Sequence, residues 1–147
     1  MTRKKKTFAS ILIALNLAFI WGNSLVTGTD SGNISGGIMA WLNSFLNFGP
    51  EGMEILHHLI RKAAHFTEFA CLGALLAWRC SMEMQKHPIA FPMLLGMAAG
   101  LVDETIQLFT PDRGPSLTDV WIDTSGALAG IMLLILGHHL IKRKMNH

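Results

Sequence analysis

LIRKAAHFTEFACLGALLAW, residues 59–78, is a long apolar segment that carries a stripe of ionisable side chains, and most of the fold prediction follows from it. Arg61, His65 and Glu68 are spaced i, i+4 and i+7, so they share about 60° of arc on one face of an α-helix. Ionisable groups in hydrocarbon cost several kcal/mol unless they have partners or face a cavity. We therefore expect a membrane-spanning helix whose polar stripe faces the interior of a helical bundle.

The composition agrees with a membrane protein. Of the 147 residues, 50% are hydrophobic and 15% are charged, and the mean hydropathy is +0.38. Basic clusters occupy both ends of the chain, residues 3–6 and 142–144. Basic clusters beside apolar runs are typical of cytoplasmic membrane anchors, so we expect the lipid bilayer as a partner and no nucleic acid.

Four segments are each near the ~20 residues needed to cross a bilayer: residues 8–26, 59–78, 89–109 and 119–141. Helix is the spanning structure that fits segments of this length. The sequence therefore predicts an all-α fold, a four-helix transmembrane bundle in the cell membrane, with residues 1–147 as one domain. The start of the chain resembles a signal peptide, but no clear cleavage site follows it, so we expect an uncleaved first span.

Charge predicts the orientation. An even number of spans and two basic ends place both termini in the cytoplasm, and Arg79 and Lys86 place the loop between the second and third spans there too. Arg61, Lys62 and Arg113 then lie on the outer side, against the usual bias. Snorkelling from a helix end explains Arg61 and Lys62 in one interpretation, and ligand binding explains them in the other.

The first outer loop, residues 27–58, contains a second helical pattern. Within residues 33–48, Ile34, Trp41 and Phe45 recur at helical spacing. We expect a short amphipathic helix on the outer interface, with Trp41 as its anchor. Two roles stay open for it, a lid over the polar site or a segment that packs on the bundle.

The third and fourth spans each place acidic residues on the same face as glycines. Small residues let helices approach closely, so these faces are expected to point into the bundle. The residues on the two faces are Gly96, Gly100, Asp103 and Gln107 in the third span and Asp119, Asp123, Gly126 and Gly130 in the fourth.

Depth brings these stripes together. At about 1.5 Å per residue, His65, Glu68, Asp103 and Asp123 fall roughly 6–14 Å from the outer surface. Glu104 points about 100° away from Asp103, which favours a neighbour in the first span. The sequence thus predicts one shallow, outward-facing polar site formed by three helices.

Two motifs carry a family resemblance. Residues 61–73, RKAAHFTEFACLG, and residues 103–120, DETIQLFTPDRGPSLTDV, with Asp123, Gly126 and Gly130 after them, resemble the VanZ-like family over roughly residues 27–140. The resemblance implies a small bacterial membrane protein of the cell envelope, and one family member is linked to teicoplanin-type glycopeptide resistance. Phe69 stands where the family often has Tyr, and Asp123 where it often has Asn.

One interpretation of the polar site is a purely structural network. In it, His65 bridges Glu68 and Asp103, while Arg61 or Arg113 neutralises Asp119. Its weakness is that buried ion pairs seldom add net stability.

The other main interpretation is a site for a lipid-linked cell-wall precursor or an anionic lipid. A membrane-embedded hydrolase or transferase is a variant of it, in which His65 acts as acid or base near neutral pH, with Glu68 and Asp103 as the other catalytic candidates. Ser116 and Ser125 are weak candidates for a nucleophile. The candidate ligand-binding residues are Arg61, Lys62, Glu104, Gln107, Arg113, Asp119 and Asp123.

Metal binding and transport are the minor alternatives. His65-x-x-Glu68 has ligand spacing, but carboxylate-bridged metal sites in helical bundles use such a motif on two helices, and this chain has one. We assign no metal ligand on this basis, and the sequence indicates no particular cofactor. The outer-half position of the charges argues against a transport path.

Overall fold

The computed structural model describes residues 3–83, 87–114 and 116–145, and, within them, the side chains of all but residues 28–35 and 38. The described part of the chain forms helices and no strand, which confirms the all-α prediction. The helices are α1 (Arg3–Leu25), α2 (Gly28–Leu46), α3 (Pro50–Ser81), α4 (Ala90–Leu108) and α5 (Leu117–Met145).

Local sequence explains where α2 ends and α3 begins. Asn47 has φ 47°, the left-handed conformation that closes a helix and that Asn tolerates. Pro50 then occupies the first turn of α3, where its missing N–H costs nothing, and Glu51 complements the helix dipole. The helix therefore starts nine residues before the predicted span at residue 59, and α2 starts before the predicted residue 33.

The longest helices, α3 and α5, cross at glycines. A Cβ atom on Gly126 would meet the backbone carbonyl group of Phe66, and one on Gly130 would meet that of Ala70. Only glycine permits so close an approach. The predicted bundle-facing side of the last helix is confirmed at this crossing.

Helix α4 packs onto the same region through its own glycines. A Cβ atom on Gly96 would lie 2.8 Å from Cβ of Ala127, and one on Gly100 would lie 3.3 Å from Cβ of Asp123. The prediction that Gly100 and the acidic residues share an inward face is therefore confirmed.

An apolar core lies between α1, α3 and α4. Ile20, Phe69, Leu72, Leu76 and Ala99 are its buried members. Phe69 is fully buried here, so the absence of a tyrosine hydroxyl leaves no polar group to satisfy in the core.

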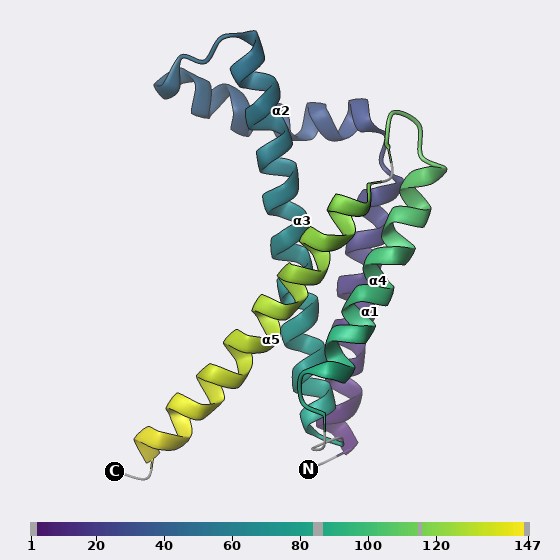
Figure 1. Ribbon diagram of the computed structural model, residues 1–147, viewed down its shortest axis with the longest axis vertical. Coiled ribbons are helices and arrows are strands. Elements are labelled where there is room, and N and C mark those ends of the chain that lie inside the picture. The colour runs from purple at the N-terminus through teal and green to yellow at the C-terminus, as the bar shows by residue number, and fades with distance from the viewer. Residues whose placement is uncertain (1–2, 84–86, 115, 146–147) are drawn as a thin grey trace.

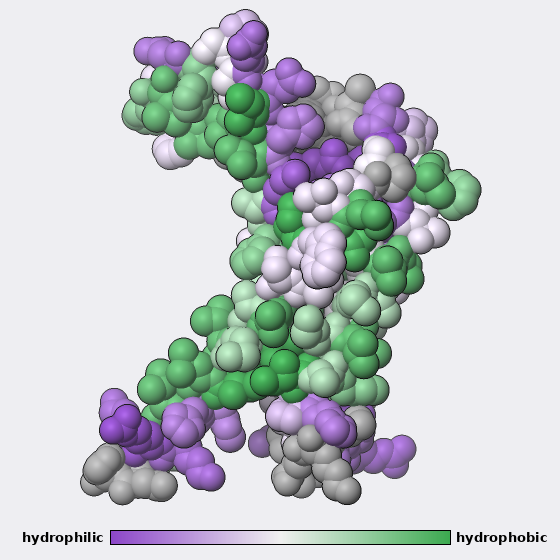
Figure 2. All heavy atoms as spheres, viewed as in Figure 1, coloured by the Kyte–Doolittle hydropathy of each residue, from purple (hydrophilic) through white to green (hydrophobic). Residues whose placement is uncertain are grey.

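The elements are arranged so that one end of the molecule is basic and the other is polar and hollowed. The first turn of α1 and the last turns of α3 and α5 lie at one end, while α2 runs across the other end (Figure 1). The final part of α5 diverges from the other helices (Figure 1). Hydrophilic residues gather at both ends, with an apolar surface between them that includes this part of α5 (Figure 2).

By length and composition, two of the described helices are able to cross a membrane, α1 and α5. Helix α3 carries Arg61, Lys62 and Glu68 within its length, and α4 carries Asp103 and Glu104. These five charged residues thus lie on helices that apolar character alone does not identify as spans, whereas Asp119 and Asp123 lie on α5, which it does identify.

Candidate functional site

Buried polar side chains gather where α1 and α4 end and α5 begins. Their burial is costly unless they are hydrogen-bonded, so each partner carries information. These side chains are Ser24, Asp103, Glu104, Gln107, Thr110, Asp123 and Thr124.

Asp103 is held by two neutral donors. Ser24 Oγ donates to its Oδ1 at 2.6 Å, and Gln107 Nε2 donates to its Oδ2 at 2.8 Å. Arg61 Nη2 donates to Gln107 Oε1 at 3.2 Å, so the guanidinium reaches Asp103 through an amide. The predicted shared face of Asp103 and Gln107 is confirmed, whereas Ser24 was not among the predicted site residues.

His65 lies between two carboxylates from different helices. Its Nδ1 is 3.8 Å from Oδ2 of Asp103 and 3.6 Å from Oδ1 of Asp123. The prediction that His65 bridges Glu68 and Asp103 is wrong for Glu68, because the second carboxylate beside His65 belongs to Asp123. Glu68 instead accepts a hydrogen bond from Asn23 Nδ2 of α1 at 3.0 Å.

Asp123 is the least satisfied group of the layer. It is 0% exposed, and neither of its carboxylate oxygens has a hydrogen-bond partner among the described residues. His65 Nδ1 is likewise buried and without a hydrogen bond in this part of the chain. A carboxylate and an imidazole therefore face each other across a distance too long for a hydrogen bond.

Glu104 closes the turn between α4 and α5. Its Oε2 accepts the backbone N–H of Ser116 at 2.6 Å. The prediction that Glu104 has its neighbour in the first helix is wrong. Its partner is Ser116, where the chain returns to begin α5 beside α4.

Arg113 binds the end of α1. Its Nε donates to the Val26 carbonyl at 3.1 Å and its Nη2 to the Asn23 carbonyl at 3.2 Å. Burial, assisted by the nearby Arg61 guanidinium, lowers the pKa of Arg113. The Arg113 guanidinium thus caps backbone carbonyls at the end of α1. The prediction that Arg61 or Arg113 neutralises Asp119 is wrong, because the cation beside Asp119 is Lys62, whose Nζ lies 3.8 Å from Asp119 Oδ1.

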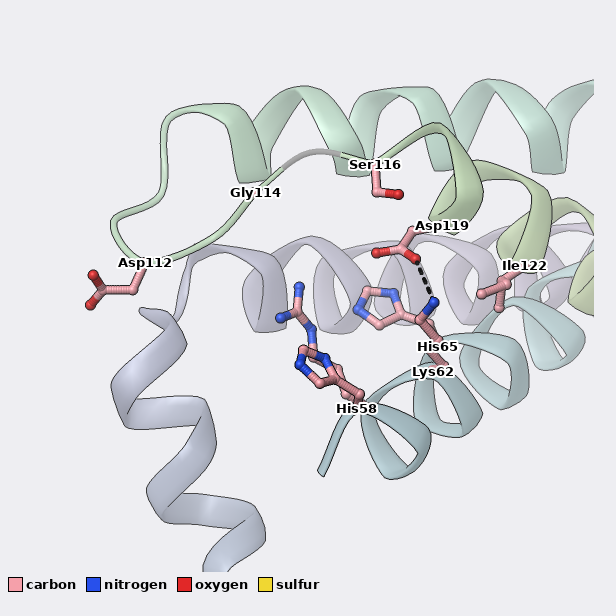
Figure 3. A pocket seen from close by; sticks show the side chains of 9 residues that line it. His58, Lys62, His65, Asp112, Gly114, Ser116, Asp119 and Ile122 are labelled. Carbon is pink, nitrogen blue, oxygen red and sulfur yellow. Dashed lines mark ion pairs between the residues drawn. The ribbon is translucent and has the colours of Figure 1, made fainter. Parts of the chain in front are cut away.

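Next to the buried layer of Asp103, Gln107 and Asp123 lies a cleft of about 370 Å³, between α3 and the α4–α5 turn. Lys62 and Asp119 face each other across it, with His65 beside them, whereas the Asp112 carboxylate lies at the left of the view (Figure 3). The cleft is lined by His58, Arg61, Lys62, His65, Asp112, Gly114, Ser116, Asp119 and Ile122.

The comparison with known proteins agrees with the motifs that build this site. The sequence profile of the VanZ/LLP1 family matches residues 7–138, most of the chain and every helix that lines the site. The chain belongs to the VanZ/LLP1 family. Comparisons with curated proteins and with solved structures gave no match.

In this VanZ/LLP1 protein the predicted single pocket is divided into two layers. Of the predicted residues, Arg61, Lys62, His65 and Asp119 line the cleft. Asp103, Gln107 and Asp123 are fully buried beneath it, and they join the cleft through His65 and Arg61. The structure thus brings most predicted residues to one end of the bundle but gives them different surroundings.

His58 lines the cleft but is not among the residues predicted for the site from the sequence. A signal was available: His58 precedes Arg61 by three and His65 by seven positions, so it extends the polar stripe by one turn. Asn23 has a weaker signal, because it follows Asn16 by seven positions and shares its face in an otherwise apolar segment, whereas Ser24 has none of this kind.

Proposed function

We propose that this chain is a multi-pass protein of the bacterial envelope membrane, with α1, α3, α4 and α5 as its spans and both termini in the cytoplasm. Family membership and two long apolar helices support membrane association. The basic first turn of α1 and the basic last turn of α5 lie at the same end of the molecule (Figure 1). That arrangement fits an even number of crossings and the positive-inside rule.

Exposed apolar side chains support the same proposal. Phe8, Leu15 and Phe19 on α1 and Leu133 and Leu136 on α5 are each more than half exposed. Burial of such side chains in lipid removes their contact with water. Helix α2 has exposed Trp41 and Phe45 in edge-to-face contact at 5.2 Å, which suits an interfacial position.

Within this frame, the cleft binds the anionic headgroup of an envelope lipid or a lipid-linked precursor. The observation that carries the proposal is the pair of cations on one wall, Arg61 and Lys62, in a cleft whose volume of about 370 Å³ lies in the range of ligand sites. Among the described residues, Arg61 makes one hydrogen bond, to the neutral amide of Gln107, which leaves the rest of its planar fork to bind phosphate oxygens.

Lys62 is also available to an anion. Its ion pair with Asp119 is long, at 3.8 Å, and its side chain is 45% exposed. Such an exposed ion pair contributes little free energy, so a phosphate group that binds Lys62 loses little by breaking the pair with Asp119.

The test is headgroup binding by the purified protein in detergent, measured by native mass spectrometry with dioctanoyl phosphatidylglycerol, dioctanoyl phosphatidylcholine and farnesyl diphosphate as probes. We expect the anionic probes to bind, and Arg61→Gln to weaken their binding by roughly tenfold, about 1.4 kcal/mol. Arg79→Gln is the matched control, because Arg79 lies on the same helix at the basic end. Equal effects of the two variants would exclude the cleft as the binding site.

In the cell, binding of a cell-wall precursor by the cleft would contribute to glycopeptide resistance. If the ligand is a cell-wall precursor, expression of the chain raises teicoplanin tolerance, and Arg61→Gln removes that gain while Arg79→Gln keeps it. If neither variant loses teicoplanin tolerance, or if both lose it, the cleft is not responsible for the resistance.

A hydrolase or transferase is the second candidate, favoured by the position of His65 between the cleft and the two buried carboxylates. An imidazole in this place is able to accept or donate a proton at a headgroup oxygen. Release of inorganic phosphate from farnesyl diphosphate, lost in His65→Gln, would support it. Binding without turnover would leave the ligand-binding proposal alone.

A further inference from the structure

We propose that His65, Asp103 and Asp123 bind a divalent cation of a first-row transition metal, such as Zn²⁺ or Mn²⁺. One ligand atom from each residue lies within 4.8 Å of the other two. The three residues come from α3, α4 and α5, so the proposed ion would join the three helices that cross at this end. This inference does not depend on what the cleft binds.

The distances between the side chains fit an ion better than they fit direct contacts. His65 Nδ1 is 3.8 Å and 3.6 Å from the nearest oxygens of Asp103 and Asp123. Hydrogen bonds between such groups fall near 2.7–3.2 Å. Ligand atoms at about 2.0–2.2 Å from a shared ion lie roughly 3–4 Å from one another, which matches the two distances from His65 Nδ1 to the carboxylates.

Asp123 provides the second, independent sign of a ligand. Its carboxylate is 0% exposed, points toward His65, and has no hydrogen-bond partner for either oxygen within residues 3–83, 87–114 and 116–145. A buried carboxylate without a donor is strongly disfavoured unless a cation or a proton neutralises it. The nearby imidazole Nδ1 is buried and without a donor or acceptor in the same residues.

The surroundings of Asp103 resemble the outer shell of a metal site. Its Oδ1 accepts from Ser24 and its Oδ2 from Gln107, so the carboxylate is fixed in orientation. Hydrogen bonds of this kind orient metal ligands and their loss weakens metal binding. Arg61 in turn holds the Gln107 amide.

The ligand set selects the class of ion. One imidazole nitrogen and two carboxylates suit Zn²⁺, Mn²⁺ or Fe²⁺, whereas Mg²⁺ and Ca²⁺ prefer oxygen alone. Three protein ligands leave a coordination position for water or another oxygen ligand. Because His65 also lines the cleft, the proposed ion lies next to the space where a headgroup would sit.

This set differs from the metal motif that the sequence suggests. His65-x-x-Glu68 has ligand spacing within one helix, but Glu68 accepts a hydrogen bond from Asn23 instead. The grouping observed here takes one ligand from each of three helices, and no spacing within one segment reveals it.

The test uses the full chain purified in detergent with an affinity tag that contains no histidine. Metal content is measured by inductively coupled plasma mass spectrometry, and the chelator-treated protein is titrated with Zn²⁺ and with Co²⁺ as a spectroscopic probe. We expect one ion per chain, a higher melting temperature on Zn²⁺ addition, and visible Co²⁺ bands that Zn²⁺ abolishes.

Matched variants assign the ligands. Asp123→Asn and His65→Gln should each weaken Zn²⁺ binding by at least roughly tenfold. Asp119 lies one turn before Asp123 on α5, and His58 lies on the same stripe of α3 as His65. Asp119→Asn and His58→Gln should therefore both retain the ion. Lys62→Gln, on the cationic wall of the cleft, should also retain the ion, which separates this test from the test of headgroup binding.

Two results would overturn the inference. One is wild-type protein that neither retains an ion nor responds to Zn²⁺ or Co²⁺, which would mean that protons alone neutralise the trio. The other is metal binding that is unchanged in both Asp123→Asn and His65→Gln. If a variant fails to fold, the Co²⁺ and Zn²⁺ titrations of the wild-type protein still decide between an ion and protons.

Discussion

Helix α3 carries an arginine toward each end, and the two arginines lie in opposite surroundings. Arg79 pairs with Glu83 at 2.9 Å, and Lys6 reaches the same carboxylate at 3.1 Å, all near solvent at the basic end. Arg61 reaches a neutral amide, above a buried layer in which His65 and Asp123 lack hydrogen bonds within the described residues. Charges at the basic end are thus paired at contact distance, whereas His65 and Asp123 beneath the cleft are buried and held apart.

The contrast between the two ends bears on where the proposed site lies. Exposed ion pairs contribute about 0–1 kcal/mol and cost little to keep. Buried ionisable groups that are left without partners are costly, and such groups cluster at binding and catalytic sites. The difference between the two ends therefore supports the proposal that a ligand binds at the cleft end.

The largest expected effect concerns the crossing that holds the cleft end together. Gly130→Ala would place a methyl group against the Ala70 carbonyl, so we expect it to cost about 3 kcal/mol in free energy of unfolding. Gly137→Ala, farther along α5 toward the basic end, has nothing within 4 Å of the new Cβ atom and should be neutral or slightly stabilising. Thermal or denaturant unfolding in detergent compares them, and similar losses in both would refute the close crossing.

Two serines on α1 compare the ends directly. Ser24→Ala removes the donor to buried Asp103 and should cost about 1–2 kcal/mol. Ser10 accepts a hydrogen bond from Arg79 near solvent, so Ser10→Ala should change stability by less than about 0.5 kcal/mol. Equal melting temperatures for the two variants would mean that the Ser24–Asp103 bond contributes nothing.

The smallest effect is a titration at the basic end. Arg79 and Lys6 lower the pKa of Glu83 from 4.5 to about 2. A lowered pKa means that the pairing stabilises the fold above pH 4.5 and is lost as the pH falls from 4.5 toward 2. Carboxyl NMR should give a midpoint near 2 for Glu83 in the wild-type protein, and a value closer to 4.5 in Arg79→Gln. An unshifted wild-type midpoint would show that the pair is absent in solution.

Periodicity within single helices predicted the faces but not the partners. The shared face of Asp103 and Gln107 and the glycine face of α5 follow from 3.6 residues per turn, and the structure confirms both. The pairing of Lys62 with Asp119 and of Glu68 with Asn23 depends on how far one helix is shifted along another. No pattern within one segment encodes that shift.

The same limit explains the division of the predicted pocket. Depth along the helices correctly brought His65, Asp103 and Asp123 to one level. Which residues line a cleft and which lie beneath it depends on the close approach of α3 and α5 and on the return of the chain at Ser116. His65 alone of these three reaches both layers, and it was the centre of the predicted site.

The most direct test of the account is a crystal structure of the protein with bound dioctanoyl phosphatidic acid. The account predicts phosphate density in the cleft, within hydrogen-bond distance of Arg61 and Lys62. Phosphate bound only at the basic end, against Arg79 or Lys6, with an empty cleft, would contradict it.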